Sequence, residues 1–420
     1  MTGIALGCIA DDFTGATDLA NNLVRAGLRV VQTIGVPRRP VRDADAVVIA
    51  LKSRTAPVAE AVSASLGAAT WLQAQGARCL YFKVCSTFDS THKGNIGPVA
   101  EALADLVGAR FVPVAPAFPA NGRTVFQGHL FVGDQLLSES PMRTHPLTPM
   151  TDANLMRVLQ PQLASRRVGL VARQHLAGGA AAVHERAGNL AEQGVQMAIV
   201  DTVEQPDLAV LAAAVAQGNW PLVVAGSGLA IELPGAMGLK RHTQADALPA
   251  TDGARAIVSG SCSAATNAQV AAFMARGGSA FAIDGLRLAA GADALVDEAL
   301  AWAAAHLGAQ PVLFYATAQA ETVRSVQQAL GVERAGELIE QALARIARGL
   351  VDRGVRQLVV AGGETSGACV KALGIEQLRI GAQIDPGVPW CHADPPGLRI
   401  ALKSGNFGGT DFFHKAFATT

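Results

Sequence analysis

The sequence has little charge and no excess of either sign. Charged residues make up 16% of the 420 residues, and 34 lysines and arginines balance 34 aspartates and glutamates. A neutral chain lacks the positive field that attracts nucleic acid or an anionic membrane. We therefore expect a small-molecule partner, with no nucleic acid and no membrane involved.

Paired cysteines and long apolar runs are also lacking. The six cysteines form no CxxC pair and no metal-ligand spacing, which is typical of unpaired thiols in a reducing compartment. No stretch reaches the roughly 20 apolar residues that cross a bilayer, and the N-terminal apolar run lacks the basic segment of a signal peptide. These absences predict a cytoplasmic protein.

What the chain does have is 50% hydrophobic residues, enough for large cores. Its length predicts two or three domains at roughly 150 residues per domain. Short apolar runs such as DAVVIAL and PLVVAGS alternate with alanine-rich segments of helical length, which indicates parallel sheets covered on both faces. We predict an α/β protein with two α/β domains, each a mainly parallel sheet flanked by helices.

A stretch rich in proline, glycine and polar residues interrupts this alternation after the middle of the chain and predicts a linker. We place a first domain at 1–235, the linker at 236–254 and a second domain at 255–420, and we expect the active site in the cleft between the domains. Residues 122–140 also break the pattern and predict a β-hairpin insertion.

Two adjacent acids, Asp11 and Asp12, end the first predicted strand in the segment IADDFTGATD. Asp12 or Thr14 could simply cap the helix that follows. In open α/β sheets, however, ligands bind beyond the carboxyl ends of strands, so the paired acids could instead face a ligand. The local sequence leaves both interpretations open.

The loop after the predicted strand near Tyr81, KVCSTFDSTHKGNIG, collects cations, hydroxyls and acids. Such residues suit a small hydroxylated acid, although a solvated loop explains them equally well. Arg143, which lies between prolines, is suited to form a bidentate hydrogen-bonded pair with a carboxylate. A lone loop arginine is more often just solvated.

In the second half, three predicted strands lead into glycines with serine or threonine: VSGSCSAAT, VVAGGETSGA and ALKSGNFGGTD. Glycine lets backbone N–H groups approach an anion, and a helix N-terminus adds a favourable dipole, so such loops can cradle phosphate. None matches a P-loop or a dinucleotide fingerprint. Glu364 either sits favourably at a helix start or approaches Mg²⁺ or a nucleotide hydroxyl, and Lys403 either reaches a phosphate or faces solvent.

One domain thus suits a hydroxylated acid and the other a polyphosphate. Transfer of a phosphoryl group fits this division, because a carboxylate beside the acceptor hydroxyl would orient it and accept its proton. Asp11 and Asp12 are the available carboxylates.

These motifs resemble the four-carbon acid sugar kinase family over nearly the whole chain. The resemblance rests on five segments in the family's order: IADDFTGATDLA, KVCSTFDSTHKGNIGPV, VSGSCSAATNAQV, VVAGGETSGACV and LKSGNFGGTDFF. The second segment, together with KSGNFG, is similar to the 3-oxo-tetronate branch, whereas kinases for D-threonate or D-erythronate resemble a KxDSTLRGN pattern. The resemblance implies phosphorylation of the C4 hydroxyl of a 3-oxo-tetronate by ATP, with Mg²⁺ accompanying ATP, in the catabolism of four-carbon acid sugars.

The resemblance also implies roles for individual residues. It places Asp11 and Asp12 at the acceptor, and from position we select Asp12 as the catalytic base. The sugar-acid pocket would be lined by Lys83, Ser86, Thr87 and Asp89, with Arg143 as a further substrate-binding candidate. The ATP-binding motifs fall on Ser259, Ala361, Gly362, Gly363, Glu364, Thr365, Lys403, Ser404 and Gly405. Metal ligands stay unassigned, and a homo-oligomer is possible.

Two other interpretations remain. A family member that phosphorylates D-threonate, D-erythronate or a related acid would differ only in its pocket. A non-catalytic sugar-acid sensor would bind ligand without ATP turnover, although the intact glycine loops argue against it.

Overall fold

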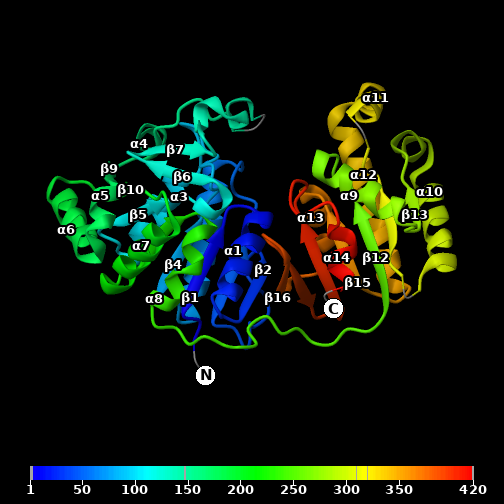
Figure 1. Ribbon diagram of the computed structural model, residues 1–420, viewed down its shortest axis with the longest axis horizontal. Helices are drawn as coiled ribbons and strands as arrows, with labels where there is room; N and C mark the ends of the chain where they lie inside the picture. Colours follow the sequence, from blue (N-terminus) through cyan, green and yellow to red (C-terminus); the bar gives the residue numbers. More distant parts are fainter. Residues whose placement is uncertain (1–2, 146–147, 309, 319, 419–420) are drawn as a thin grey trace. The chain divides into compact units, whose positions relative to one another are not determined.

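A computed structural model describes residues 3–145, 148–308, 310–318 and 320–418. The chain forms two compact units, unit 1 (Met1–Asp246) and unit 2 (Ala247–Thr420). Each unit has its own helices and strands (Figure 1). Among the described residues, no helix combines the length and the apolar character that a membrane span requires.

Unit 1 is built on a parallel sheet with the strand order β2-β3-β1-β4-β11-β5-β10-β9. Its strands are β1 (Leu6–Ala10), β2 (Val30–Ile34), β3 (Ala46–Ala50), β4 (Cys79–Lys83), β5 (Val112–Ala115), β9 (Val168–Val171), β10 (Met197–Val200) and β11 (Leu222–Ala225). All residues of β1, β3 and β4 are buried, as expected for strands that are covered on both faces.

Helices cover this sheet on both faces. They are α1 (Phe13–Arg25), α2 (Val58–Ala74), α3 (Ile96–Val107), α4 (Leu155–Leu159), α5 (Arg173–Ala177), α6 (Gly179–Glu192), α7 (Gln205–Gln217) and α8 (Leu233–Ala236), with short 3₁₀ turns η1 (Pro119–Asn121), η2 (Leu137–Glu139), η3 (Pro141–Thr144), η4 (Gln160–Gln162) and η5 (Ser227–Ile231). On one face, Leu72 of α2 and Val99 of α3 belong to the same buried core as Ile9 and Phe82 of the sheet.

The predicted hairpin insertion is confirmed. Strands β6 (Arg123–Phe126), β7 (His129–Val132) and β8 (Gln135–Leu136) form a separate antiparallel sheet. The buried carboxylate of Asp201, just after β10, accepts the backbone N–H groups of Gln127 and Gly128, both at 2.9 Å, and of Arg173 at 3.0 Å. This carboxylate therefore has a structural task, because it anchors the hairpin to the sheet.

The strand order creates a topological switch point at the carboxyl ends of β1 and β3. These strands are neighbours, yet the chain leaves β1 through α1 toward β2 and leaves β3 through α2 toward β4, in opposite directions. Right-handed crossovers in opposite directions place their helices on opposite faces of the sheet. Ligands in open α/β sheets bind at such a point.

Unit 2 has a sheet with the strand order β13-β14-β12-β15-β18-β17-β16. Strands β12 to β15 and β18 run parallel. Strand β17 pairs antiparallel with β18, and β16 pairs antiparallel with β17. The strands are β12 (Ala254–Ser259), β13 (Ala280–Ala282), β14 (Val312–Tyr315), β15 (Val355–Ala361), β16 (Gln377–Asp385), β17 (Val388–Ala393) and β18 (Leu398–Lys403). The expected fold class, two α/β domains with mainly parallel sheets flanked by helices, is confirmed.

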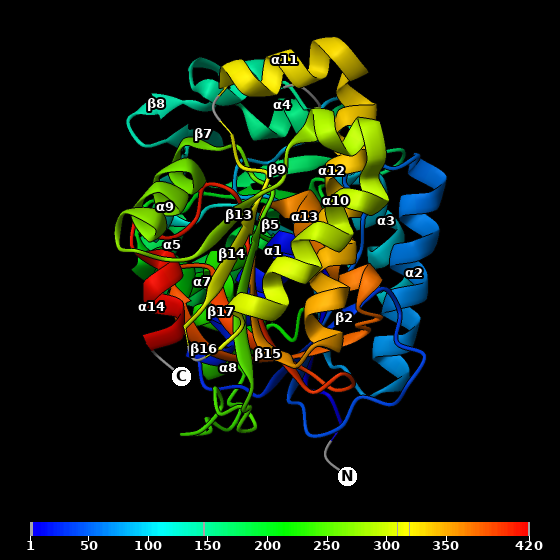
Figure 2. The same cartoon turned by 90° about the vertical axis from the view of Figure 1, so that its right-hand side faces the viewer.

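Helices also lie on both sides of this second sheet (Figure 2). They are α9 (Ala264–Ala275), α10 (Gly285–His306), α11 (Ala320–Leu330), α12 (Val332–Asp352), α13 (Gly363–Ala372) and α14 (Phe412–Ala418). Val359 of β15 shares a core with Phe273 of α9 and Phe412 of α14, while the adjacent Leu358 and Val360, on the opposite face, are also fully buried.

The second sheet has a switch point of the same kind. The chain leaves β12 toward β13 and leaves the neighbouring β15 toward β16, which lies on the other side in the strand order. The glycine-rich segments that follow β12 and β15 therefore meet at a topological switch point.

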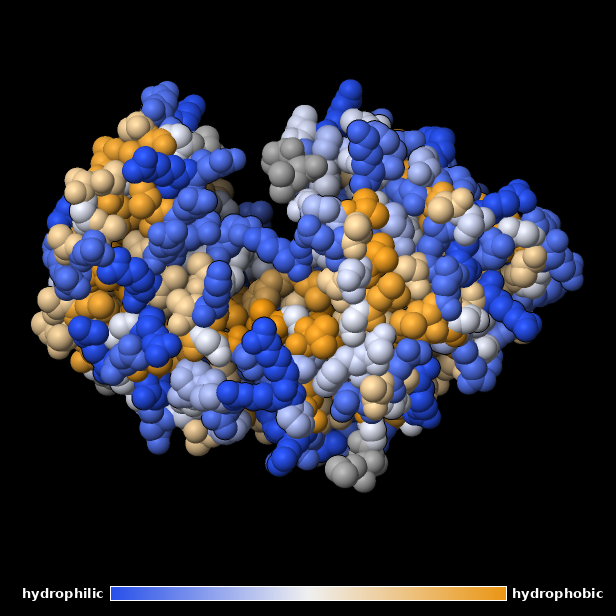
Figure 3. All heavy atoms as spheres, turned by 180° about the vertical axis from the view of Figure 1, so that it is seen from behind, coloured by the Kyte–Doolittle hydropathy of each residue, from blue (hydrophilic) through white to orange (hydrophobic). Residues whose placement is uncertain are grey.

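Apolar side chains reach the surface at several places on the face shown in Figure 3, among many hydrophilic ones. The exposed large apolar residues of the described chain come from several elements and loops: Ile34, Val36, Val58, Leu106, Phe126, Met274 and Leu286. Scattered exposure of this kind is normal for a folded protein and marks no site by itself.

Candidate active site

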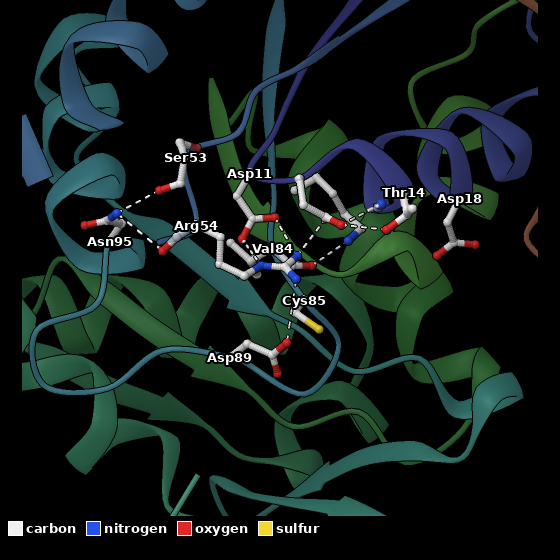
Figure 4. Close-up of polar contacts among 12 residues, drawn as sticks. Asp11, Thr14, Asp18, Ser53, Arg54, Val84, Cys85, Asp89 and Asn95 are labelled. Atoms are coloured by element: carbon white, nitrogen blue, oxygen red, sulfur yellow. Dashed lines mark hydrogen bonds and ion pairs between the residues drawn. The ribbon is translucent and has the colours of Figure 1, made fainter. Parts of the chain in front are cut away.

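The segments that follow β1, β3 and β4 meet at the carboxyl edge of the unit 1 sheet (Figure 4). The carbonyl of Asp11 accepts the N–H groups of Ser53 at 3.0 Å and Arg54 at 3.1 Å, and the N–H of Asp11 donates to the carbonyl of Lys83 at 3.2 Å. Backbone hydrogen bonds thus hold the three segments together. Asp11, Asp12 and Lys83 lie at one edge, as the strand-end rule predicts.

Asp12, rather than Thr14, is the N-cap residue of α1. Its Oδ2 accepts the Thr14 hydroxyl at 2.7 Å and the Gly15 N–H at 3.2 Å, and its Oδ1 accepts from Arg54 Nη2 at 2.7 Å. Burial acts to raise the pKa of Asp12, but the charges of Arg54 and Lys83 and these hydrogen bonds outweigh it and hold the pKa below its ordinary value. Asp12 is therefore ionised at neutral pH.

Asp11 is more enclosed than Asp12. Its residue is 5% exposed, and its oxygens accept from Arg54 Nε and Nη2, both at 2.9 Å. Such a bidentate pair is strong and directional. Asp11 therefore presents little surface to a ligand, whereas Asp12 keeps a side chain that is 25% exposed.

Arg54 is the functional candidate that the sequence interpretation missed. Burial acts to lower the pKa of Arg54, but Asp11 and Asp12 outweigh it and raise the pKa, so the guanidinium stays charged. The polar run KSRT directly follows the apolar run DAVVIAL, so the strand-end rule could have selected it. Its importance depends on β3 lying next to β1, which local sequence does not reveal.

Lys83 ends β4 and is 3% exposed, with Nζ donating to the Val84 carbonyl at 2.8 Å. A Cβ at Gly15 would lie 2.2 Å from Asp12 Oδ1 and 2.9 Å from Lys83 Nζ. Only glycine therefore allows these two groups to come this close to α1. One turn further along α1, Asp18 accepts the Ser227 hydroxyl.

The segment after β4 adds a third carboxylate. Thr87 Oγ1 donates to Asp89 Oδ1 at 2.5 Å, and Arg54 Nη1 lies 3.6 Å from Asp89 Oδ2. Thr87 and Asp89 are buried, whereas the adjacent Ser86 is half-buried. Arg143 is exposed on η3, and none of the described contacts links it to this cluster.

In unit 2, the ends of β12 and β15 are tied together at the glycine-rich loops. The Ala361 carbonyl accepts the N–H groups of Gly260 at 2.9 Å and Ser261 at 3.2 Å. Ser259 is fully buried, and its hydroxyl lies 2.6 Å from that of Thr317. Ser259 is therefore part of the buried support of the loop and has no exposed surface in this conformation.

Gly362 and Gly363 carry the chain into α13. Gly362 has φ +129°, which favours glycine, and its N–H donates to the Lys403 carbonyl at 2.8 Å. Gly363 and Glu364 are exposed in the first helical turn, while Thr365 is buried. The turn presents backbone N–H groups and the positive end of the helix dipole, which suits an anion.

Lys403 is fully buried, not solvent-facing. Its Nζ donates to Thr266 Oγ1 and to the carbonyls of Ser404 and Gly405, each at 3.0 Å. An ammonium group has three N–H donors, so all three are engaged in this conformation. Burial lowers the pKa of Lys403 to about 8.

The segment after β18 is fixed against α9 by further contacts. The Gly405 carbonyl also accepts the hydroxyls of Ser263 at 2.6 Å and Thr266 at 2.8 Å. Gln269 Nε2 lies 3.0 Å from the carbonyls of Phe407 and Gly408 and 3.1 Å from that of Gly409. Because these carbonyls accept hydrogen bonds from side chains at the start of α9 and within it, the loop is held in one defined shape.

Among the described residues, no group of three or more His, Cys, Asp or Glu side chains could hold a metal ion. The donors at the unit 2 loops are hydroxyls, backbone groups and the carboxylates of Glu364 and Asp411. This donor set suits a cation such as Mg²⁺, which is coordinated mainly by water and by phosphate oxygens of the substrate.

Two protein-family models match the chain. A sugar-binding N-terminal domain matches residues 6–233, and a nucleotide-binding C-terminal domain matches residues 256–413. The cluster formed by Asp11, Asp12, Arg54 and Asp89 lies in the first match, and the glycine-rich loops of unit 2 lie in the second.

Similar proteins span nearly the whole chain. The 3-oxo-tetronate kinase of Burkholderia multivorans is 58% identical over 98% of this chain and 96% of its own, and that of Cupriavidus necator is 56% identical with the same coverage. Among solved structures, Haemophilus influenzae protein HI1011 is 44% identical with a TM-score of 0.86, covering 98% of this chain and 99% of its own. A Salmonella typhimurium protein described as a putative tRNA synthase is 40% identical with a TM-score of 0.91 and covers 98% of each chain. The chain therefore belongs to the four-carbon acid sugar kinase family and groups with its 3-oxo-tetronate kinase branch.

Proposed function

We propose that this chain transfers the γ-phosphoryl group of ATP to the C4 hydroxyl of a 3-oxo-tetronate. The relatives named 3-oxo-tetronate kinase support the substrate and the reaction. The structural observation that carries the proposal is the Asp12 carboxylate, ionised and partly exposed at the switch point of the sugar-binding unit. A carboxylate placed there can accept the proton of an acceptor hydroxyl.

In this proposal the C4 oxygen forms a bond to the γ-phosphorus while the bond from that phosphorus to the β,γ-bridging oxygen breaks and ADP leaves. Asp12 Oδ1 takes the hydroxyl proton. Lys83, Ser86, Thr87 and Asp89 contact the sugar acid, and Arg143 stays a further candidate. Both Asp11 oxygens are engaged by Arg54, so Asp11 acts through Arg54 rather than by direct contact.

For ATP, we propose that the backbone N–H groups of Gly362, Gly363, Glu364 and Thr365 meet the phosphates at the start of α13, beside Ala361. Ser404 and Gly405 supply a second glycine-containing loop. Ser259 at the end of β12 contributes as a buried residue next to the ATP site. Lys403 shapes that second loop. Mg²⁺ would be held mainly by the ATP phosphates and would offset their charge, since the described residues include no group of three or more His, Cys, Asp or Glu side chains that could hold it.

A panel of four-carbon acids with ATP tests this function. Purified enzyme is incubated with 3-oxo-tetronates, D-threonate and D-erythronate, and ADP formation is followed. We expect the highest kcat/KM with a 3-oxo-tetronate. A preference for a reduced tetronate would favour the alternative kinase, and ligand binding without ADP formation would favour the sensor.

A further inference from the structure

Arg54 lies at the centre of the carboxylate cluster in unit 1 (Figure 4). It binds Asp11 through Nε and Nη2, both at 2.9 Å, and binds Asp12 through Nη2 at 2.7 Å. Its Nη1 faces Asp89 at 3.6 Å, which is an ion-pair distance rather than a hydrogen bond. One guanidinium thus links acids from the segments after β1 and β4.

The backbone around Arg54 is also fixed. Its N–H donates to the Asp11 carbonyl at 3.1 Å. The buried Asn95 amide Nδ2 donates to the carbonyls of Ser53 at 2.7 Å and Ala56 at 2.8 Å, and reaches that of Arg54 at 3.3 Å. Because the backbone is held on both sides, the guanidinium is placed with little loss of conformational freedom when a ligand arrives.

The acceptor sites of Asp12 can be counted. A carboxylate oxygen offers about two lone-pair sites. Among the described residues, Oδ2 accepts from Thr14 and Gly15, while Oδ1 accepts only from Arg54. One site on Oδ1 is therefore left for an acceptor hydroxyl, and Arg54 sets the direction in which it points.

Charge gives Arg54 a second effect on Asp12. The ionisable groups around Asp12 are Asp11 beside it, Asp18 on α1, Lys83 at the end of β4, and Arg54, Cys85 and Asp89 from the segments after β3 and β4. The acids Asp11, Asp18 and Asp89 favour a protonated Asp12, and only Arg54 and Lys83 oppose them. Removing Arg54 would leave Lys83 as the one cation of this set.

We propose that Arg54 is a positioning residue for phosphoryl transfer, which aims the free Oδ1 lone pair of Asp12 at the acceptor hydroxyl and keeps that carboxylate ionised. This inference rests on the proposed function. Arg54 itself need not touch the substrate.

Arg54→Lys and Arg54→Gln separate the two effects. Lysine keeps the charge but lacks the planar fork, so kcat should fall about 100-fold while the acidic limb of the kcat–pH profile stays close to that of the wild type. Glutamine lacks the charge as well. Its kcat should fall further, and the acidic limb should move to higher pH because the Asp12 pKa rises without the cation.

Arg29→Lys provides the matched control. Arg29 binds Asp45 through the same fork, with Nε at 3.1 Å from Oδ2 and Nη2 at 2.8 Å from Oδ1, away from the cluster. Its kcat and pH profile should match the wild type. A purely structural role of Arg54 would lower the folded fraction without moving the pH profile, and circular dichroism reports that fraction.

Full kcat in Arg54→Lys, or an unmoved acidic limb in Arg54→Gln, would overturn the inference. If Arg54→Gln does not fold, the kcat of Arg54→Lys decides alone. Failure of the proposed function looks different, since wild-type enzyme would then form no ADP with a 3-oxo-tetronate.

Discussion

Asp12 combines a structural and a chemical task in one side chain. Its Oδ2 caps α1 through Thr14 and Gly15, and its Oδ1 points to Arg54 with one acceptor site left. The cap and the base therefore use different oxygens of the same carboxylate. The two interpretations of IADDFTGATD, which the sequence left open, are compatible.

Asp12→Asn tests the base at this residue. Asparagine is about as good an N-cap as aspartate, so α1 should form normally. We expect kcat to fall by two or more orders of magnitude, roughly the contribution of a general base, while the Kd for ATP stays unchanged. Steady-state kinetics and ATP binding by calorimetry measure both quantities. Near-normal turnover would move the base to another group.

Gly15→Ala tests the close approach of Asp12 and Lys83. A Cβ here would lie 2.2 Å from Asp12 Oδ1, so that carboxylate must move, and we expect kcat to fall although alanine is the better helix former. Gly67→Ala in α2 is the control, because nothing lies within 4 Å of its Cβ position. That variant should gain up to about 1 kcal/mol of stability and keep its activity. Equal activity in both variants would contradict the packing argument.

At the scale of loops and elements, the sequence predicts more of the fold than of the site. Alternating apolar runs indicated the parallel sheets, and the break at 122–140 indicated the hairpin, because both depend on local composition. Arg54 was missed since its role depends on strand order. Lys403 could not be recognised as buried because one of its partners, Thr266 on α9, lies far away in the sequence.

The loop after β18 gives a prediction at this scale. Lys403→Met removes three donated hydrogen bonds, including those to the Ser404 and Gly405 carbonyls, and keeps the apolar volume. The loop should lose its defined shape, and the Kd for ATP should rise about tenfold or more. Lys371→Met, an exposed lysine at the end of α13, should leave the Kd unchanged.

A double variant distinguishes an indirect role of Lys403 from direct contact with phosphate. Thr266 accepts from Lys403 and donates to the Gly405 carbonyl, which Lys403 also binds. If Lys403 acts through the loop, the effects of Lys403→Met and Thr266→Val on ATP binding should be strongly non-additive. Additive effects would indicate that Lys403 contacts ATP independently.

The pH dependence of ATP binding follows from the same lysine. Burial lowers the pKa of Lys403 to about 8, so the ammonium loses its proton as the pH rises through this value. The neutral amine has one donor fewer and no charge, so ATP affinity should weaken between about pH 7 and about pH 9. In Lys403→Met this weakening should be absent. The same pH dependence in both proteins would assign it to another group.

At the scale of the whole molecule, each unit carries its own topological switch point. Hydrogen exchange with each ligand alone should therefore give separate patterns. A 3-oxo-tetronate should protect the segments after β1, β3 and β4, and ATP should protect those after β12, β15 and β18. Protection of the unit 2 loops by the sugar acid alone would contradict this assignment.

The identity of the product tests the central claim most directly. Enzyme, ATP with Mg²⁺ and a 3-oxo-tetronate are combined, and the proton-coupled phosphorus NMR spectrum of the new ester is recorded. Because C4 carries two protons, phosphorylation at its hydroxyl predicts a phosphate triplet that appears as ADP forms. A doublet, which indicates transfer to the C2 hydroxyl, or the absence of a new phosphate ester would contradict the account.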